Sequence, residues 1–467
     1  MINTFFVDCR QSVYADGNFF AICFVVSKSF HIFATEKERR PIMKTRIAFC
    51  HCSILILFLW MFMATVAVAQ EQRGNSLFVV SGRVFNENNR PMAHVNVSVP
   101  SEHVAVVTNE DGLFTLKCAA RPPFIIVSHV GYHQRRVSIA AQTPSRGQEG
   151  LNIKLQPSTV VLQDLVVVSG NAEDILRAAM SKIPVNYSRD DELYTCFYRE
   201  TVQKRRRYIN VAEAVAKLYK SPIYNNPTSD RVAIEKGRRL ISPKADDTLG
   251  VKIMGGPNTP IWIDVVKNRD FILNDEDLQY YSFTMDIPVT IDERPQFVII
   301  ATPSHYAPYA LFGGKFYIDR QTLAFTRAEL SLDMYDKGKA TQYMLVKKPW
   351  GVRFKPREMT VLVNYHYDGQ LTRISYVRSF FRFNCDWKKR LFSTSFTAQS
   401  ELVVTDRQTE DFQIPRGRDS FYQRDSFFDK VSYFEDPDFW RDYNIIEPTE
   451  SLEEAIGKLK KTVAENN

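Results

Sequence analysis

Apolar and polar residues alternate over short distances between residues 77 and 157. Val95, Val97 and Val99 are separated by polar residues, as in a strand that buries one face. Similar runs recur about every 8–12 residues with turn-forming residues between them, which is typical of a β-sandwich of immunoglobulin-like architecture. We therefore expect six or seven short strands here, with Gly82 as a bulge in the first strand.

A helix is expected after a linker strand over residues 158–171. Asn171 is a favourable N-cap residue, and Ile175 and Ile183 have the spacing of one helix face. Pro184 has no backbone N–H, so we expect it to end this helix.

The rest of residues 172–405 is predicted to form long antiparallel strands. Residues 315–332 indicate a hairpin that turns at Arg320 and Gln321. The run at 207–219 favours a strand, although its spacing also suits a helix. The other predicted strands lie at 192–202, 341–348, 358–369, 371–384 and 391–406.

Two stretches depart from the strand pattern. A polar stretch at about 221–263, around the sequence MGGP, predicts an insertion that acts as a mobile flap. Residues 406–467 are expected to form an aromatic tail and a final helix, with Ser451 and Glu454 as its capping box. The predicted fold is therefore mainly β: the N-terminal sandwich, a larger curved antiparallel sheet (a half-barrel) with a leading helix, and a C-terminal helix.

Three segments of the predicted sandwich carry a common pattern. They read SGRVFNENNRPMAHVNVSV, TNEDGLFTL and IIVSHVGYHQRRVSI, in this order. The pattern resembles that of the carboxypeptidase regulatory-like domain, a transthyretin-like β-sandwich. The resemblance implies an accessory module without peptidase residues. It also implies that Asp111 and Gly112 close a hairpin and that Phe114 and Leu116 fill the core.

The hairpin sequence GGKFYIDRQTLAFTRAEL is similar to a recurrent motif of the lipoprotein-carrier (LolA/LolB-like) half-barrel. This resemblance implies a concave apolar face able to hold an acyl chain or a hydrophobic peptide. The aromatic residues that suit such a face are Phe380, Phe381, Phe383, Trp387 and Phe392. The other interpretation is that these rings form the core under a closed sheet.

An export signal is predicted to begin at Met43. Lys44 and Arg46 precede an apolar run at 53–63, and the sequence AVA then predicts cleavage before Gln70. Residues 43–69 are therefore interpreted as a signal peptide, which indicates a periplasmic or outer-membrane-associated protein. Residues 1–42 are interpreted as an over-extended start. The alternative is a cytoplasmic extension ahead of a signal-anchor.

The charge and the cysteine content bear on two further questions, whether the protein binds nucleic acid and whether it contains disulfide bonds. A net charge of +7, from 60 Lys and Arg against 53 Asp and Glu, is mild for 467 residues and does not indicate a nucleic-acid partner. Only Cys118, Cys196 and Cys385 lie beyond the predicted signal. So sparse and odd a set argues against a disulfide framework. We expect three buried thiols, and one bridge with a spare thiol remains open.

Two groups of potential metal ligands lie in the predicted sandwich. His129 and His133 are four residues apart, but Gly131 lies between them on a strand and turn, so their side chains need not converge. Glu110 and Asp111 lack the further acidic oxygens that a calcium loop needs. We therefore expect neither a metal nor another cofactor.

The sequence contains no G-x-S-x-G, H-E-x-x-H or Gly-rich phosphate loop. Paired carboxylates occur at Asp246 and Asp247 and at Glu453 and Glu454, in an expected loop and a surface helix. We therefore expect no catalytic residues. The histidines beyond the signal are His94, His103, His129, His133, His305 and His366.

The leading functional hypothesis is an exported, non-catalytic envelope protein that binds a hydrophobic ligand, such as a lipid or hydrophobic peptide, or a partner protein. One alternative is an accessory of TonB-dependent glycan or peptide uptake that docks on an outer-membrane receptor, because PSTVVLQDLVVVSG resembles the start of such receptors. Another is an uncharacterised hydrolase. The basic run Lys204, Arg205, Arg206 and Arg207 indicates contact with anionic lipid or lipopolysaccharide, or a solvated hairpin tip.

Overall fold

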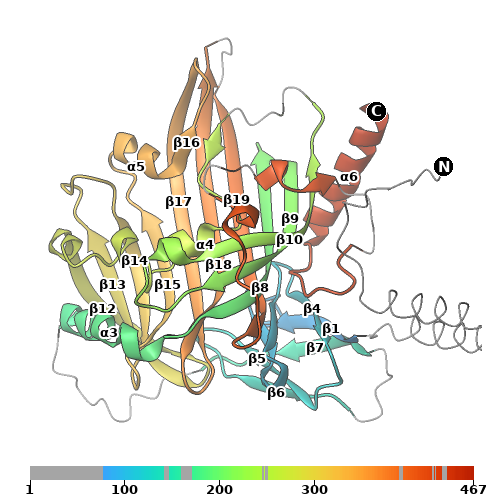
Figure 1. Cartoon of the computed structure of the whole chain (residues 1–467), viewed down its shortest axis with the longest axis vertical. Helices are drawn as coiled ribbons and strands as arrows, with labels where there is room; N and C mark the ends of the chain where they lie inside the picture. Colours follow the sequence, from blue (N-terminus) through green and yellow to red (C-terminus); the bar gives the residue numbers. More distant parts are fainter. Residues whose placement is uncertain are drawn as a thin grey trace, which may run out of the picture. The chain divides into compact units, whose positions relative to one another are not determined.

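The computed structural model describes residues 77–140, 147–158, 171–244, 247, 251–388, 393–422, 425, 427–433 and 439–466 (Figure 1). Every described residue belongs to one compact unit within Ser76–Asn467. The predicted signal peptide, the segment before it, Asp246 and Phe392 lie outside the described residues, as does most of the linker.

The N-terminal part is a sandwich of two small sheets, as the strand spacing predicted. One sheet has the order β4 (Leu113–Cys118), β1 (Phe78–Phe85), β7 (Gly147–Lys154), and the other has the order β3 (Val104–Val107), β2 (Asn96–Val99), β5 (Phe124–Ser128), β6 (Arg135–Ser138). Val97, Phe114 and Leu116 are at most 2% exposed between the sheets. The expected core positions are confirmed.

Two positions of the sandwich, one in a strand and one in a turn, show why glycine is present there. The register between β1 and β7 shifts next to Gly82, but the extra residue lies on β7, because Val80 and Gly82 pair with Gln148 and Leu151. The predicted bulge is therefore on the partner strand, and a Cβ at Gly82 would lie 2.4 Å from the Leu151 carbonyl oxygen. Gly112 has a φ of 72°. It does not close a hairpin with Asp111, because β3 and β4 belong to different sheets. The turn therefore carries the chain from one sheet to the other.

The larger body is one long sheet of ten antiparallel strands, with a two-residue parallel strand at one edge. Its order is β12 (Tyr281–Ile291), β13 (Arg294–Pro303), β14 (Phe312–Asp319), β15 (Phe325–Leu332), β17 (Val352–Tyr367), β18 (Thr372–Trp387), β19 (Thr394–Gln408), β8 (Glu192–Lys204), β9 (Arg207–Lys220), β10 (Arg231–Ile241), β20 (Ser432–Tyr433). β8 pairs with β19, so the first hairpin of the sheet lies beside its last long strand. The fold is mainly β, as predicted.

The predicted insertion at 221–263 is partly wrong, because β10 is an integral strand of the sheet. It pairs with β9 along most of its length, and Val232 and Leu240 are buried. Its many charged residues hid the strand pattern. One of them, Arg238, is neutralised by Glu213 of β9 at 3.0 Å, a pairing that the local sequence does not reveal.

The strand predicted at 341–348 is also wrong for its first half, which lies in helix α5 (Lys337–Met344). The Asp336 carboxylate accepts hydrogen bonds from the backbone N–H groups of Gly338 and Lys339, which caps the helix. Ala340 and Met344 lie one turn apart and are buried. Strand β16 (Leu345–Lys347) follows and pairs with β11 (Lys252–Ile253).

The leading helix, α3 (Ala172–Asn186), begins at the predicted cap. Asn171 and Asp174 form a capping box. The helix does not end at Pro184, since packing of Ile183 and Tyr187 against the core maintains its last turn although one N–H is missing.

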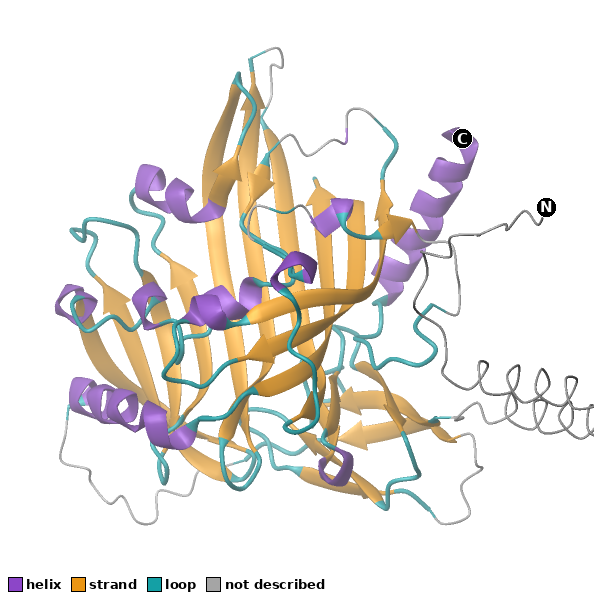
Figure 2. Cartoon of the chain, viewed as in Figure 1, coloured by secondary structure: helices purple, strands orange, loops and turns teal. Residues whose placement is uncertain are grey.

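The two faces of the large sheet are covered differently. We call the face that carries Tyr198 and Val202 the inner face; α3 and the segment 251–280, with the short helix α4 (Thr259–Trp262), lie across it and share its apolar core (Figure 2). The outer face carries Phe197 and Val403, which pack against the tail through Trp440 and against the sandwich. The longest helix of the tail is α6 (Glu450–Asn466).

The predicted capping box of α6 is wrong, because the N-cap lies two residues earlier, at Thr449. The Thr449 hydroxyl, rather than that of Ser451, accepts a hydrogen bond from the Leu452 N–H at 3.1 Å. Ser451 lies inside the helix, which begins at Glu450. No helix among the described residues combines the length and the hydropathy needed to span a bilayer.

Candidate functional site

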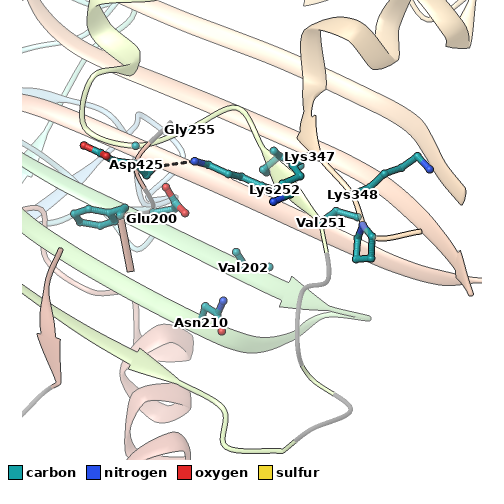
Figure 3. A pocket seen from close by; sticks show the side chains of 13 residues that line it. Glu200, Val202, Asn210, Val251, Lys252, Gly255, Lys347, Lys348 and Asp425 are labelled. Carbon is teal, nitrogen blue, oxygen red and sulfur yellow. Dashed lines mark hydrogen bonds between the residues drawn. The ribbon is translucent and has the colours of Figure 1, made fainter. Parts of the chain in front are cut away.

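The inner face contains a cavity of about 470 Å³ near one end of β8 and β9 (Figure 3). Its walls come from segments far apart in the sequence: β8, the start of β9, the stretch 251–256, the stretch 347–349 and the tail. The lining residues are Glu200, Val202, Asn210, Val251, Lys252, Ile253, Gly255, Gly256, Lys347, Lys348, Pro349, Asp425 and Phe427.

The strand alternation of β8 decides which side chains enter the cavity. Arg199 lies on the outer face, where it forms an ion pair with Glu213 at 2.7 Å. Glu200 and Val202, one and three positions later, therefore belong to the inner face and line the cavity. The pattern of β8 thus places an apolar and an acidic side chain side by side in the same cavity.

The acidic side of the cavity is an ordered hydrogen-bond chain. The Tyr198 hydroxyl donates to the Glu200 carboxylate at 2.7 Å and accepts from the Gly256 N–H at 3.0 Å. Burial raises the pKa of the Glu200 carboxyl, and the Tyr198 hydrogen bond and the charge of Lys252 only partly oppose that shift. The chain fixes the stretch around Gly256 to the sheet.

Three lysines also line the cavity. Lys252 of β11 and Lys347 of β16 are register partners, and Lys348 is the next residue. The Lys252 ammonium group donates to the Asp425 carbonyl oxygen at 2.9 Å, the contact drawn in Figure 3. Apolar side chains line the same cavity, among them Val251 and Ile253. The cavity therefore combines apolar, acidic and lysine side chains.

The aromatic residues of β18 are divided between the two faces. Phe381 and Phe383 are buried in the inner core, and Trp387 packs against the edge of the same core. Phe380 lies on the outer side, where the Arg382 guanidinium is 5.4 Å from its ring centroid. These described rings are not among the lining residues of the cavity, so the interpretation of Phe381 and Phe383 as core residues holds.

A second cavity, of about 420 Å³, lies between the sandwich and the large sheet. It holds a His–carboxylate pair, with 3.2 Å between His366 Nδ1 and Asp292 Oδ2. Ser128 donates to the same carboxylate. Asp292 thus lies between Ser128 and His366, whereas a hydrolytic triad needs the imidazole between the hydroxyl and the carboxylate. This geometry gives no support to hydrolysis.

A serine and a lysine also meet in a buried cluster. Lys267 Nζ donates to Ser221 Oγ at 2.8 Å, while Ser221 Oγ donates to Asp230 Oδ1 at 2.9 Å. A lysine that activates serine must be neutral and accept its proton. Lys267 instead contacts the Asp230 carboxylate, which Lys220 also contacts at 2.9 Å. The cluster is a set of buried ion pairs.

The candidate metal ligands of the sandwich do not form a site. His129 contacts the Val130 carbonyl oxygen, whereas His133 contacts Glu293 of the β12–β13 turn. Asp111 accepts a hydrogen bond from the Glu450 N–H. No group of three or more potential ligand side chains is present among the described residues.

The remaining predicted residues have structural partners. Asp247 binds both Lys204 and Arg207, while Arg205 and Arg206 extend from the same turn. Glu454 forms a surface pair with Lys458. The cysteines Cys118, Cys196 and Cys385 are free and fully buried, which confirms the expectation of three buried thiols.

Sequence comparison identifies the sandwich. Residues 80–167 match the CarboxypepD_reg-like domain family. This match covers the sandwich and the start of the following segment, but not the large sheet. None of the curated proteins matches the chain.

Two solved structures resemble the large sheet. One is a domain assigned as an outer membrane lipoprotein-sorting protein from Vibrio parahaemolyticus, with 11% identity, a TM-score of 0.23, and coverage of 51% of this chain and 93% of that one. The other is lipovitellin, from a study of its lipid–protein interactions, with 8% identity, a TM-score of 0.21, and coverage of 48% of this chain and 26% of that one. At such scores, neither likeness carries a functional argument.

Proposed function

We propose that this chain is an exported, non-catalytic protein of the cell envelope that holds an amphiphile with a hydrophobic tail and an anionic head. The observation that carries this proposal is the cavity on the inner face, in which apolar side chains lie beside Lys252, Lys347 and Lys348. Burial of a hydrocarbon chain in such a cavity is favourable by about 0.8 kcal/mol per CH₂ group. The positive charge of these lysines would attract an anionic head group.

The location in the envelope is supported by the signal pattern before Gln70 and by the CarboxypepD_reg-like domain. The proposed binding role is supported by the hydrogen bonds of the polar groups in the cavity. The Glu200 carboxylate accepts a hydrogen bond from Tyr198, whose hydroxyl accepts one from the Gly256 N–H, and it is part of the cavity wall. Binding, rather than transformation of a ligand, is the activity that this arrangement favours.

The first experiment is mass spectrometry of lipids extracted from protein purified out of its native envelope. The second is titration with a fluorescent fatty acid. Ile253→Trp places an indole ring in the cavity and should weaken binding about tenfold, since displacing about two CH₂ groups of the ligand costs about 1.6 kcal/mol. Ile287→Trp is the matched control, because Ile287 is 79% exposed on β12.

These two experiments distinguish ligand binding in the cavity from binding elsewhere on the protein and from no binding. Co-purified lipid together with a selective loss of binding in Ile253→Trp would support the proposal. Absence of lipid and of fatty-acid binding in the unaltered protein would refute it. Equal losses in Ile253→Trp and Ile287→Trp would place the binding surface outside the cavity.

The alternative of an uptake accessory depends on the CarboxypepD_reg-like domain as a docking module. In this structure the sandwich also contacts the large sheet, where the Gly131 N–H donates to the Thr290 carbonyl oxygen at 2.8 Å and the Gln134 N–H to Glu293 at 2.6 Å. These contacts favour a structural role for that face of the sandwich. Binding to a purified TonB-dependent receptor would support the alternative.

A further inference from the structure

Several connections bring basic residues to one end of the large sheet. Lys204, at the end of β8, is the register partner of Phe396 near the start of β19. The Lys388 N–H, just after β18, donates to the Gly351 carbonyl oxygen just before β17. We call this region the basic end and define it by Arg205, Arg206, Lys347, Lys348, Trp350 and Lys388.

Trp350 is the most unusual residue of the basic end. Its side chain is 90% exposed on the loop between β16 and β17. The Lys388 ammonium group lies 4.1 Å from the centroid of its ring. Trp262, Trp387 and Trp440, by contrast, are buried or partly buried. An exposed tryptophan among lysines suits the boundary between water and lipid, where its ring is apolar and its N–H remains hydrated.

The charges of this end are not neutralised within the described part of the molecule. Asp247 forms ion pairs with Lys204 and Arg207. These ion pairs hold the two ends of the turn between β8 and β9 in place. Arg205 and Arg206 lie at its exposed tip, with φ angles of 49° and 72°. Like Lys347, Lys348 and Lys388, they form no ion pair with any described residue.

Acidic residues near this end already have partners. The Asp386 carboxylate pairs with Lys355, which keeps its pKa below the usual range, and hydrogen bonding is the main cause. The basic end therefore presents a net positive surface around an exposed indole ring. Such a surface matches an anionic bilayer in charge, and its exposed indole ring suits the boundary between water and lipid.

We propose that the basic end docks the protein on an anionic phospholipid bilayer, with Trp350 at the lipid boundary and Arg205, Arg206 and Lys388 against the head groups. Lys347 and Lys348 belong both to this end and to the lining of the inner cavity. The docked protein would hold the cavity mouth near the bilayer. The docking itself does not depend on the proposed cavity ligand.

The test uses protein purified from its native envelope and phosphatidylcholine vesicles with or without phosphatidylglycerol. Binding is measured by co-sedimentation. Each basic residue near an anionic surface strengthens binding about fivefold, so R205Q with R206Q should weaken it about 25-fold. The control pair R90Q and K182Q removes two exposed charges elsewhere and should change binding less than about twofold.

The contribution of the indole ring is tested separately. Trp350→Ala should weaken binding, whereas Tyr306→Ala, which removes a ring that is 96% exposed elsewhere, should not. Trp350→Phe should retain most of the binding but lose the blue shift of tryptophan emission that accompanies it. The three other tryptophans of residues 77–467 are more enclosed, which makes Trp350 the main source of that shift.

Selective binding to phosphatidylglycerol vesicles, lost in the arginine pair and retained in its control, would support docking. Equal binding to both kinds of vesicle would overturn it, as would equal losses in the two charge pairs. An unchanged blue shift in Trp350→Phe would also overturn it. Because these readouts use lipid surfaces alone, an empty cavity would refute the proposed function without affecting them.

Discussion

The Gly256 N–H donates a 3.0 Å hydrogen bond to the hydroxyl of Tyr198, a residue of β8 that is 58 positions away in the sequence. Tyr198 is 1% exposed, and its hydroxyl donates a hydrogen bond to the Glu200 carboxylate. Burial and the Glu200 carboxylate raise the pKa of the Tyr198 hydroxyl well above its usual range, so the hydroxyl remains a donor. One backbone amide thereby ties the stretch over the cavity to the sheet beneath it.

Gly256→Ala is expected to destabilise the protein and weaken ligand binding. Gly256 has a φ of 102°, and a Cβ there would lie 2.5 Å from the Phe421 ring. Gly369 has the same φ but open space around the Cβ position. Gly369→Ala should therefore cost about 1 kcal/mol from the backbone alone, whereas Gly256→Ala should cost about 2–4 kcal/mol because overpacking is added. Urea denaturation measures both, and equal losses would exclude the steric argument.

Lys347→Gln is expected to weaken binding of a fatty acid by about two- to fivefold, because an exposed ion pair contributes about 0.3–1 kcal/mol. Binding of the alcohol with the same chain should stay unchanged, since the alcohol has no charge. Lys182→Gln on α3 is the control for net charge. If the acid and the alcohol lose affinity equally, the lysine contributes through contact area rather than through charge.

Glu200→Gln is expected to raise stability at neutral pH. Burial raises the pKa of Glu200 in the folded state above its value in the unfolded chain. The folded state therefore holds the proton more tightly, and stability falls as pH rises through the folded pKa. Glutamine can still accept the Tyr198 hydrogen bond, so the variant should be more stable than the parent at pH 7 and lose this advantage in acid. Glu173→Gln, on the surface of α3, should not show this pH-dependent gain.

Much of the fold follows from local patterns, whereas the cavity does not. The alternation of Val95, Val97 and Val99 predicted a strand because neighbouring positions already show which face is buried. The hairpin at 315–332 was predictable for the same reason. The cavity instead depends on stretches separated by more than 200 residues, such as Val202 and Phe427, and no periodicity connects them.

Buried charges were the main source of error. Arg238 made β10 look like part of a polar insertion, because its partner Glu213 lies on the neighbouring strand. Burial disfavours the charged form of Glu213, but Arg199 and Arg238 outweigh this and lower its pKa. The carboxylate also accepts a hydrogen bond from Trp440 at 3.1 Å. A local hydropathy pattern cannot distinguish such a neutralised group from a solvated one.

The contact between sandwich and sheet predicts how stability responds to acid. Glu401 of β19 accepts a hydrogen bond from the Tyr376 hydroxyl at 2.7 Å and lies 3.6 Å from His94 of the sandwich. Burial opposes the charge, but His94 and Tyr376 outweigh it and lower the pKa of Glu401 to about 2. A lowered carboxyl pKa contributes stability above the unfolded value of 4.5, and this stability is lost as pH falls toward 2.

Glu401→Gln should therefore destabilise the protein at pH 7 by about 2 kcal/mol and flatten the decline in stability between pH 4.5 and 2. Urea denaturation across this range measures the effect. Glu358→Gln is the control, because Glu358 forms a more exposed pair with Arg382 and should change stability by less than about 0.5 kcal/mol. If Glu401→Gln retains the acid dependence of the parent, the link between the sandwich and the sheet does not titrate through this carboxylate.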